Sequence, residues 1–336
     1  MPNIIAIGAS AGGVEPLREI VRRLPGDLQA AIFVVMHISP MAPSLLPRIL
    51  NSSGPLTASA AEDGERIMPS RIYVAPPDLH LLIEAGWIRL SRGPRENRHR
   101  PAIDPLFRSA ARAYGPRVVG IVLTGLLDDG AVGLHVIKSE GGVAIVQDPK
   151  EAMFPSMPSS AMKAGEVDFV LRVSEIPQKI LELAREPWKP IDLTRAKDIE
   201  RAAVSPEGEK MSEELDERRM GKPSMFTCPE CSGTLWEVQD GDLLRFRCRV
   251  GHAFSPEAVR DGYSDSVEGA LWTAVRTLEE SAALERRLSK QAAARGDLLS
   301  ADRFGDVAIG REQQAAMIRD ILMSKKRTEE NADEIA

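Results

Sequence analysis

A serine near the start of the chain stands in a turn of small residues, where its hydroxyl could act as a nucleophile. Ser10 lies within Gly8-Ala9-Ser10-Ala11-Gly12-Gly13, which has the G-x-S-x-G spacing of a nucleophile elbow. An apolar run at 4–8 precedes it and a helical pattern at 14–24 follows. A turn of this kind exposes the hydroxyl at the carboxyl edge of a sheet, where N–H groups at the helix start can stabilise an oxyanion.

Two other interpretations of this turn stay open: a glycine-rich phosphate loop and a turn with a structural role only. The phosphate loop is disfavoured because it would have G-x-G-x-x-G spacing and an acidic residue at the end of the second strand. Here the second predicted strand, 30–37, ends in Met36-His37. The spacing therefore favours the nucleophile without excluding the alternatives.

A serine hydroxyl needs a base within hydrogen-bond reach, and His37 is placed to supply it. Adjacent parallel strands end on the same edge of a sheet, so His37 should lie close to Ser10. His99 is the main competitor because it lies in the polar segment 97–101. His80, in a predicted hairpin, and His135, in a predicted helix, are expected to be structural.

Two aspartates follow the strongly apolar strand predicted at 118–124, at the edge where the serine and the histidine are expected. Either Asp128 or Asp129 could cap the helix that begins near residue 131. Their position makes at least one of them a suitable partner for the imidazole. Ser160-x-x-Lys163 matches another nucleophile spacing, but four residues are a weak match, and capping or solvated roles are favoured.

All three cysteines lie close together in the second half of the chain. Cys228-x₂-Cys231 and Cys248-x₃-His252 are separated by sixteen residues, which is a zinc-ribbon-like spacing. Zinc would hold together a segment too small to fold on its apolar core alone. Three free thiols are the alternative. A catalytic zinc is disfavoured because four protein ligands leave no open position.

The elements that position these residues indicate an α/β domain at 1–186 with a doubly wound, mostly parallel sheet. Apolar, β-branched runs alternate with helical patterns. The region 56–92 differs, because its short runs at 71–75, 79–84 and 87–91 are separated by turn residues, which predicts hairpins on an antiparallel flank. A further helix is predicted at 104–114, with Asp104 as its N-cap and Pro105 at its first position.

The rest of the chain divides into three parts. Residues 187–224 are rich in charge and proline and predict a flexible linker. Residues 225–255 form the zinc-ribbon-like module. Residues 256–330 predict two helices with a break near Gly296, arranged as a helical hairpin or a short coiled coil, through which the protein could form a homodimer.

Composition excludes several classes of protein. The formal charge of −6 lacks the basic excess of a nucleic-acid binder. No apolar run reaches the ~18 residues of a membrane span, and the first residues do not form a signal peptide. An odd, clustered set of cysteines is typical of a metal site in a reducing compartment. We therefore expect a cytoplasmic protein that neither binds nucleic acid nor inserts into a membrane.

Several separated motifs, in one order, resemble a known family over about 1–185. They are IGASAGG at 7–13, VVMHISP at 34–40, RIYVAPPDLHLL at 71–82, NRHRPAID at 97–104, VLTGLLDDGAVGL at 122–134 and PSMPSSA at 155–161. Together they resemble the bacterial chemotaxis receptor protein-glutamate methylesterases, in their CheB-type catalytic domain. The resemblance implies Ser10 as nucleophile, His37 as base and Asp129 as acid, which selects Asp129 over Asp128 and His37 over His99.

The resemblance also implies a reaction and a substrate. It implies hydrolysis of glutamate γ-methyl esters on a chemoreceptor or similar signalling protein, with glutamine deamidation as a possible second activity and with no cofactor for catalysis. The backbone amides of Ala11 and Leu126 would be the oxyanion donors. Substrate contacts would come from Arg98, Arg100 and Met157, although solvated arginines or internal salt bridges are an equal alternative for such arginines.

The sequence departs from the family's pattern in three ways. Ala11 stands where threonine is frequent, and Leu126-Leu127-Asp128 replaces a run of small residues. Full-length members begin with a phosphorylatable receiver domain, and since the esterase-like motifs begin at the start of this sequence, we expect its control to come from elsewhere. A non-catalytic signalling adaptor, docking through the zinc module and helices, is the competing function.

Overall fold

The computed structural model describes residues 4–38, 43–185, 221–240 and 243–333. By their internal contacts these residues form two units, Met1–Val259 and Arg260–Ala336. The predicted linker 187–224 lies outside the described residues except for its last four positions, 221–224. The two units are taken in turn below.

Seven strands form one sheet whose neighbours are all parallel, in the order β3-β4-β2-β1-β7-β8-β9. The prediction of a mostly parallel sheet is therefore confirmed. Its strands are β1 (Ile4–Ala9), β2 (Ala31–Met36), β3 (Thr57–Ala60), β4 (Arg71–Val74), β7 (Val118–Val122), β8 (Val143–Gln147) and β9 (Phe169–Leu171).

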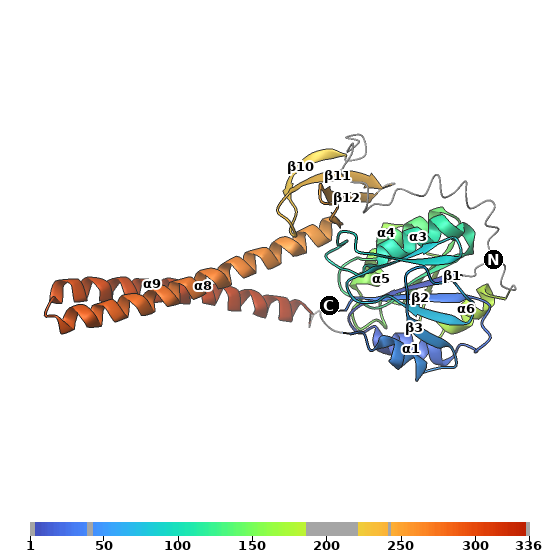
Figure 1. Ribbon diagram of the computed structural model, residues 1–336, viewed down its shortest axis with the longest axis horizontal. Coiled ribbons are helices and arrows are strands. Elements are labelled where there is room, and N and C mark those ends of the chain that lie inside the picture. Colours follow the sequence, from blue (N-terminus) through green and yellow to red (C-terminus); the bar gives the residue numbers. More distant parts are fainter. Residues whose placement is uncertain (1–3, 39–42, 186–220, 241–242, 334–336) are drawn as a thin grey trace. The chain divides into compact units, whose positions relative to one another are not determined.

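Helices cover both faces of this sheet (Figure 1), so it is doubly wound. One face packs against α3 (Ile103–Tyr114), α4 (Ala131–Ser139) and α5 (Ser156–Ala164), through buried side chains that include Phe107 and Leu134. The other packs against α1 (Val14–Arg22), α2 (Leu46–Asn51) and α6 (Ile176–Leu183), with Leu17 and Ile176 in its core. A fully apolar strand such as Val118–Val122 follows from this double burial.

The predicted antiparallel flank is only partly right. β5 (His80–Glu84) and β6 (Trp87–Ser91) form the expected antiparallel hairpin. The run predicted at 71–75 is instead the parallel strand β4, which pairs with β2 and β3. Ile72, Tyr73 and Val74 are buried, and burial on both faces of a parallel sheet suits such an apolar run better than an edge hairpin does.

The predicted cap of the third helix is wrong. α3 begins one residue earlier than expected, at Ile103, with Ala102 at the cap position. Asp104 is fully buried. It accepts hydrogen bonds from the backbone N–H groups of Gly130 and Gly133, at 3.1 and 2.7 Å, and so ties α3 to the start of α4.

The cysteine-containing segment forms a small antiparallel sheet in the order β10-β11-β12-β13. β10 spans Lys222–Thr227, β11 Thr234–Asp240, β12 Leu243–Cys248 and β13 Ala253–Phe254. Regular structure thus begins at residue 222, three residues before the predicted start of the module at 225. The structured part, 222–255, is called the cysteine module below.

Two long helices follow, α8 (Pro256–Ala294) and α9 (Leu298–Asp333), and Gly296 lies between them with φ +78°. The break predicted near Gly296 is therefore confirmed. Within the second unit they form a hairpin, in which Arg286 of α8 pairs with Glu312 of α9 and apolar side chains such as Val275 and Ala308 are buried. Within the described residues, no helix is both long and apolar enough to cross a bilayer.

Candidate active site

Ser10 follows the last residue of β1 and lies in the turn that leads into α1. Its backbone N–H donates to the carbonyl of Thr124 at 3.0 Å, and its own carbonyl accepts from Gly13 at 3.0 Å. Gly12 has φ +71°, a region that glycine enters without strain. A Cβ atom on Gly13 would lie 2.7 Å from that of Ala9. The small residues of the motif are thus required by the tightness of the turn.

The structure brings Ser10, His37 and Asp129 together at the carboxyl ends of β1, β2 and β7. The Ser10 hydroxyl lies 3.1 Å from Nδ1 of His37, and Nε2 of His37 lies 2.7 Å from Oδ2 of Asp129. In the neutral tautomer with a proton on Nε2, Nδ1 can accept the serine proton while Nε2–H donates to the carboxylate. This order of contacts is what a serine nucleophile with an oriented base requires.

Asp129 is held by a dense set of donors. Its Oδ2 accepts from the backbone N–H of Ile103 at 2.7 Å, and its Oδ1 from the Asp104 N–H at 3.2 Å and the Asn97 amide at 3.1 Å. Burial alone would raise the pKa of this carboxyl, but the hydrogen bond and charge of His37 and the Ile103 N–H hold the pKa below its usual range. Asp129 therefore stays ionised.

The other histidines do not contact the Ser10 hydroxyl. His99 stacks on the His37 ring, with centroids 3.6 Å apart and planes within 10°. Its burial, together with the neighbouring His37, lowers the pKa of His99 to about 4, so it is neutral and supports the ring of His37. His80 is buried and bonded to the Pro94 carbonyl at 3.0 Å, and His135 lies on α4.

Asp128, the alternative acid, points elsewhere. It is buried and hydrogen-bonded by Ser255, and burial raises its pKa to about 6. The expected oxyanion donors lie in two loops near Ser10. Ala11 directly follows Ser10, and Leu126 follows Gly125, whose N–H donates to the Phe154 carbonyl at 3.0 Å. No acceptor for the backbone N–H of Ala11 or of Leu126 is found within the described residues, and their role as oxyanion donors stays a prediction.

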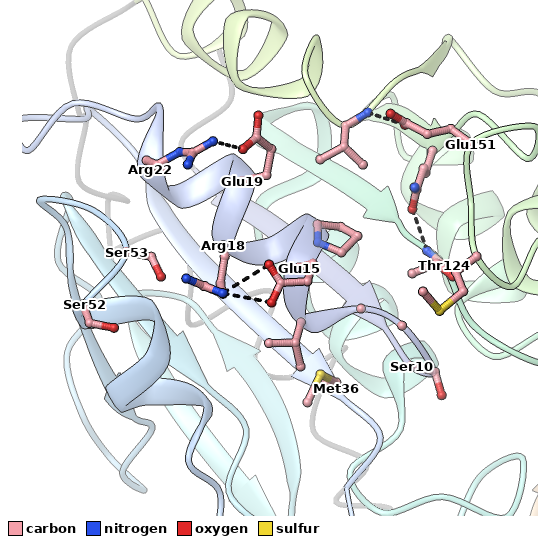
Figure 2. Close-up of a pocket in the computed structure, with 17 residues that line it drawn as sticks. Ser10, Glu15, Arg18, Glu19, Arg22, Met36, Ser52, Ser53, Thr124 and Glu151 are labelled. Atoms are coloured by element: carbon pink, nitrogen blue, oxygen red, sulfur yellow. Dashed lines mark hydrogen bonds and ion pairs between the residues drawn. The ribbon is translucent and has the colours of Figure 1, made fainter.

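A cavity of about 710 Å³ lies along α1 beside the nucleophile turn. Figure 2 shows its charged wall, where Glu15 pairs with Arg18 and Glu19 pairs with Arg22. Ser10 lies at one end of this set, and its hydroxyl is directed away from the Glu15 and Arg18 side chains. The reacting hydroxyl therefore faces His37 rather than the middle of this cavity.

Two of the expected substrate contacts have other partners in the structure, and their roles in substrate binding stay predictions. Met157 is fully buried beneath the loop at Gly125, whose carbonyl accepts from its N–H at 3.0 Å. The Arg100 guanidinium bonds Asp78 at 2.6 Å and the carbonyl of Gly93 at 2.8 Å, which is the internal salt bridge weighed as its alternative. Arg98 lies at φ +69° in the turn beside His99, and its role as a substrate contact stays a prediction.

The cysteine module gathers its four candidate ligands at one point. The sulfur and nitrogen atoms of Cys228, Cys231, Cys248 and His252 all lie within 4.8 Å of one another. The Sγ atoms of Cys231 and Cys248 are 3.6 Å apart, and Nδ1 of His252 is 3.5 Å from Sγ of Cys248. A tetrahedron with metal–sulfur bonds of about 2.3 Å has ligand separations of roughly 3.8 Å. The cluster therefore fits zinc in donor type and spacing.

Asn97 and Glu96 are functional candidates that the sequence interpretation missed. Asn97 was assigned only to a polar loop, yet its amide is buried and contacts Asp129. Glu96 forms ion pairs with Arg108 of α3, at 2.6 Å, and with Arg245 of the cysteine module, at 3.1 Å. Since Glu96 and Arg245 are 149 positions apart, no local pattern could have revealed the contact.

We expect the Glu96 ion pairs to contribute stability that is present at neutral pH and lost in acid. Burial alone would raise the pKa of Glu96, but the charges of Arg108 and Arg245 hold it at about 2, below the ordinary 4.5. A lowered carboxyl pKa contributes stability that is present above the ordinary pKa and lost as the pH falls towards 2. Glu96→Gln should therefore lower the unfolding free energy by up to ~3 kcal/mol at pH 7 and by much less near pH 3. Urea titrations at both values measure this.

The exposed Glu140 offers a matched control, because Glu140→Gln removes a surface carboxylate and should leave both curves nearly unchanged. An effect of Glu96→Gln that is the same at both pH values would contradict the electrostatic origin of this stability.

The comparisons with known proteins agree with this geometry. The sequence model of the CheB methylesterase family matches residues 5–180. A protein-glutamate methylesterase/protein-glutamine glutaminase of Hydrogenovibrio crunogenus is 39% identical over 188 residues, 55% of this chain and 50% of that protein. A putative enzyme of the same name from Leptospira interrogans is 41% identical over 53% of this chain and 93% of its own length.

A solved structure points the same way. The catalytic domain of the CheB methylesterase of Thermotoga maritima aligns with a TM-score of 0.53 and 35% identity, over 55% of this chain and 99% of that domain. The match with the Hydrogenovibrio protein spans about half the length of that relative. The family match covers more than half of the present chain, and the chain belongs to the CheB methylesterase family.

Proposed function

We propose that this chain is a serine hydrolase that removes methyl groups from glutamate γ-methyl esters of a chemoreceptor or similar signalling protein. The observation that carries the proposal is the hydrogen-bonded series from Ser10 through His37 to Asp129 at the carboxyl edge of the sheet. Membership of the CheB methylesterase family supports the substrate class. Glutamine deamidation at the same site is a second reaction of the same acyl-transfer type.

The residues divide the reaction in the following way. Nδ1 of His37 takes the Ser10 proton as the hydroxyl attacks the ester carbonyl, and the same proton then goes to the departing methanol. Asp129, kept ionised, stabilises the imidazolium that forms between these transfers. The N–H groups of Ala11 and Leu126 would hold the oxyanion. Water then cleaves the acyl-enzyme, with His37 as the base again.

The direct test is methanol release from a methylated chemoreceptor preparation, by the full chain and by Ser10→Ala. Release that depends on Ser10 supports the esterase. The competing adaptor would bind the receptor equally well with and without the Ser10 hydroxyl and would release no methanol with either protein.

Gly125 provides a second test of the site, because it lies directly against the nucleophile. A Cβ atom at Gly125 would come within 2.8 Å of Cβ of Ser10 and 2.1 Å of the Met157 sulfur. Gly125→Ala should cost about 1–3 kcal/mol of stability, and by displacing Ser10 it should lower kcat about 10²-fold. Gly26→Ala is the control for stability, since its φ, like that of Gly125, lies outside the left-handed region and the nearest atom to its added Cβ would be Pro55 Cβ at 3.5 Å, an ordinary contact. A fully active Gly125→Ala enzyme would contradict the placement of Ser10.

We also propose that Cys228, Cys231, Cys248 and His252 bind a structural zinc ion. Three thiols and one imidazole at these separations support zinc over hard cations, which prefer oxygen ligands. All four ligand positions are taken by the protein, so the ion would hold the module together and would not take part in ester hydrolysis. The free thiols also support the prediction of a reducing, cytoplasmic location.

The homodimer stays a prediction, and the hairpin surface offers some support for it. Several large apolar side chains on α8 and α9 remain exposed, among them Leu284, Met317 and Ile321. A second copy of the hairpin would cover such residues. The molar mass of the full chain in solution, measured by light scattering over a range of concentrations, tests this.

A further inference from the structure

The turn that touches the catalytic acid is held by the cysteine module. Asn97 donates its backbone N–H to the Ala253 carbonyl of β13 at 2.8 Å, and the Ala253 N–H donates to the Arg95 carbonyl at 3.3 Å. The same turn is closed on itself, because Glu96 and His99 exchange two backbone hydrogen bonds, of 3.2 and 2.9 Å. The cysteine module thus extends its last strand along the segment that carries Asn97 and His99.

Hydrogen bonds to both the nitrogen and the oxygen of the Asn97 side-chain amide fix its orientation. Its NH₂ group lies 3.1 Å from Oδ1 of Asp129 and 3.2 Å from Oδ2 of Asp104. Its Oδ1 accepts from the backbone N–H of Ser255 at 3.1 Å. The ionised Asp129 carboxylate only accepts and a backbone N–H only donates, so one rotamer of the amide satisfies the contacts to Asp129 and Ser255 and the flipped one satisfies neither.

Because Asn97 is buried, the orientation of its amide affects the orientation of the Asp129 carboxylate. Asn97 is 2% exposed, so a flipped amide would present its oxygen to the ionised Asp129 carboxylate in a buried site, where an unpaired polar contact is costly. A charge-assisted hydrogen bond to a buried carboxylate is also stronger than one between neutral groups. The amide therefore fixes the Asp129 carboxylate in the plane in which Oδ2 meets His37.

We propose that Asn97 is a positioning residue for the Asp129 carboxylate, and that the cysteine module, through the backbone N–H of Ser255, orients the Asn97 amide. This inference rests on the proposed esterase function. The module is then a part of the catalytic machinery in addition to any docking role. Disorder of the module would leave the Asn97 oxygen without its donor and release the turn from β13.

Substitution of Ser255 can remove the backbone N–H that donates to Asn97 while the Asn97 side chain itself is kept. Ser255→Pro lacks the donor, whereas Ser255→Ala keeps it; both lose the hydroxyl that accepts from Ala258. The measured quantities are the rate at which a fluorophosphonate probe labels Ser10 and the downfield proton resonance of the His37–Asp129 hydrogen bond. We expect labelling to be about 10- to 100-fold slower in Ser255→Pro than in Ser255→Ala, with the resonance broadened or shifted only in the proline variant.

Asn97→Gly removes the amide itself, and it decides the matter if Ser255→Pro does not fold. Glycine accepts the φ of +47° found at this position, so the turn is kept. We expect a similar loss of labelling rate with the turn intact. Equal rates and an unchanged resonance in Ser255→Ala, Ser255→Pro and Asn97→Gly would overturn the proposal. If the unaltered chain is not labelled at all, the proposed esterase fails, and the resonance still tests the positioning of Asp129.

Discussion

Ser10→Ala is expected to lower the kcat of the proposed ester hydrolysis by about 10⁴- to 10⁶-fold, because the proposed acyl-enzyme forms on the Ser10 hydroxyl. His37 and Asp129 would stay in place, since both are held by contacts that do not involve the serine hydroxyl, such as the Ile103 N–H on Asp129. The activity that remains would come from the oxyanion donors and substrate binding alone. The rate of methanol release under saturating receptor measures the loss.

Variants of two further serines show whether the loss of activity is specific to Ser10 or follows the loss of any serine hydroxyl. Ser139→Ala removes an exposed serine that bonds the Val136 carbonyl, and it should have no effect. Ser160, which matched the alternative S-x-x-K spacing, only reaches the Leu127 carbonyl at 3.4 Å. If Ser160→Ala were the inactive variant and Ser10→Ala kept its rate, the assignment of the nucleophile would be wrong.

The place where the site forms could be predicted because it depends on short-range rules. Ser10, His37 and Asp129 each follow an apolar strand, and parallel strands bring their carboxyl ends to one edge whatever the details of packing. The choice of Asp129 over Asp128 could not be made that way. Both follow β7, and the difference arises because Asp129 meets the N–H groups of Ile103 and Asp104, whereas Asp128 meets Ser255.

The parts that the sequence did not predict depend on contacts between distant segments. Asp104 looked like a helix cap because a short polar residue before proline is a common cap signal. Its actual partners, Gly130 and Gly133, lie 26 and 29 positions away. The role of Asn97 is still less visible, because it needs Ser255, 158 positions along the chain. Apolar periodicity predicts elements, and it carries no information on which polar side chain will be buried between them.

Removal of zinc should unfold the cysteine module and slow the esterase while the parallel sheet stays folded. Structural zinc contributes about 10–16 kcal/mol in small zinc domains, far more than the short strands β10–β13 can supply. His252→Ala, or dialysis of the full chain against a chelator, is expected to abolish metal binding and to expose the backbone N–H groups of Asn97 and Ala253 to hydrogen exchange. Zinc content by elemental analysis and exchange by mass spectrometry measure both effects.

The reaction rate of Ser10 in the metal-free protein distinguishes a cysteine module that only docks from one that also orients the catalytic acid. His135→Ala is the matched control, since it removes a histidine of α4 that lies outside the cluster and should keep the metal. If the module only docks, the fluorophosphonate probe labels Ser10 of the metal-free protein at the full rate, because a small probe does not need the docking surface. If it orients Asn97, the rate falls by about the factor expected for Asn97→Gly, and the two changes combined cost no more than either alone, because both break the same contact to Asp129.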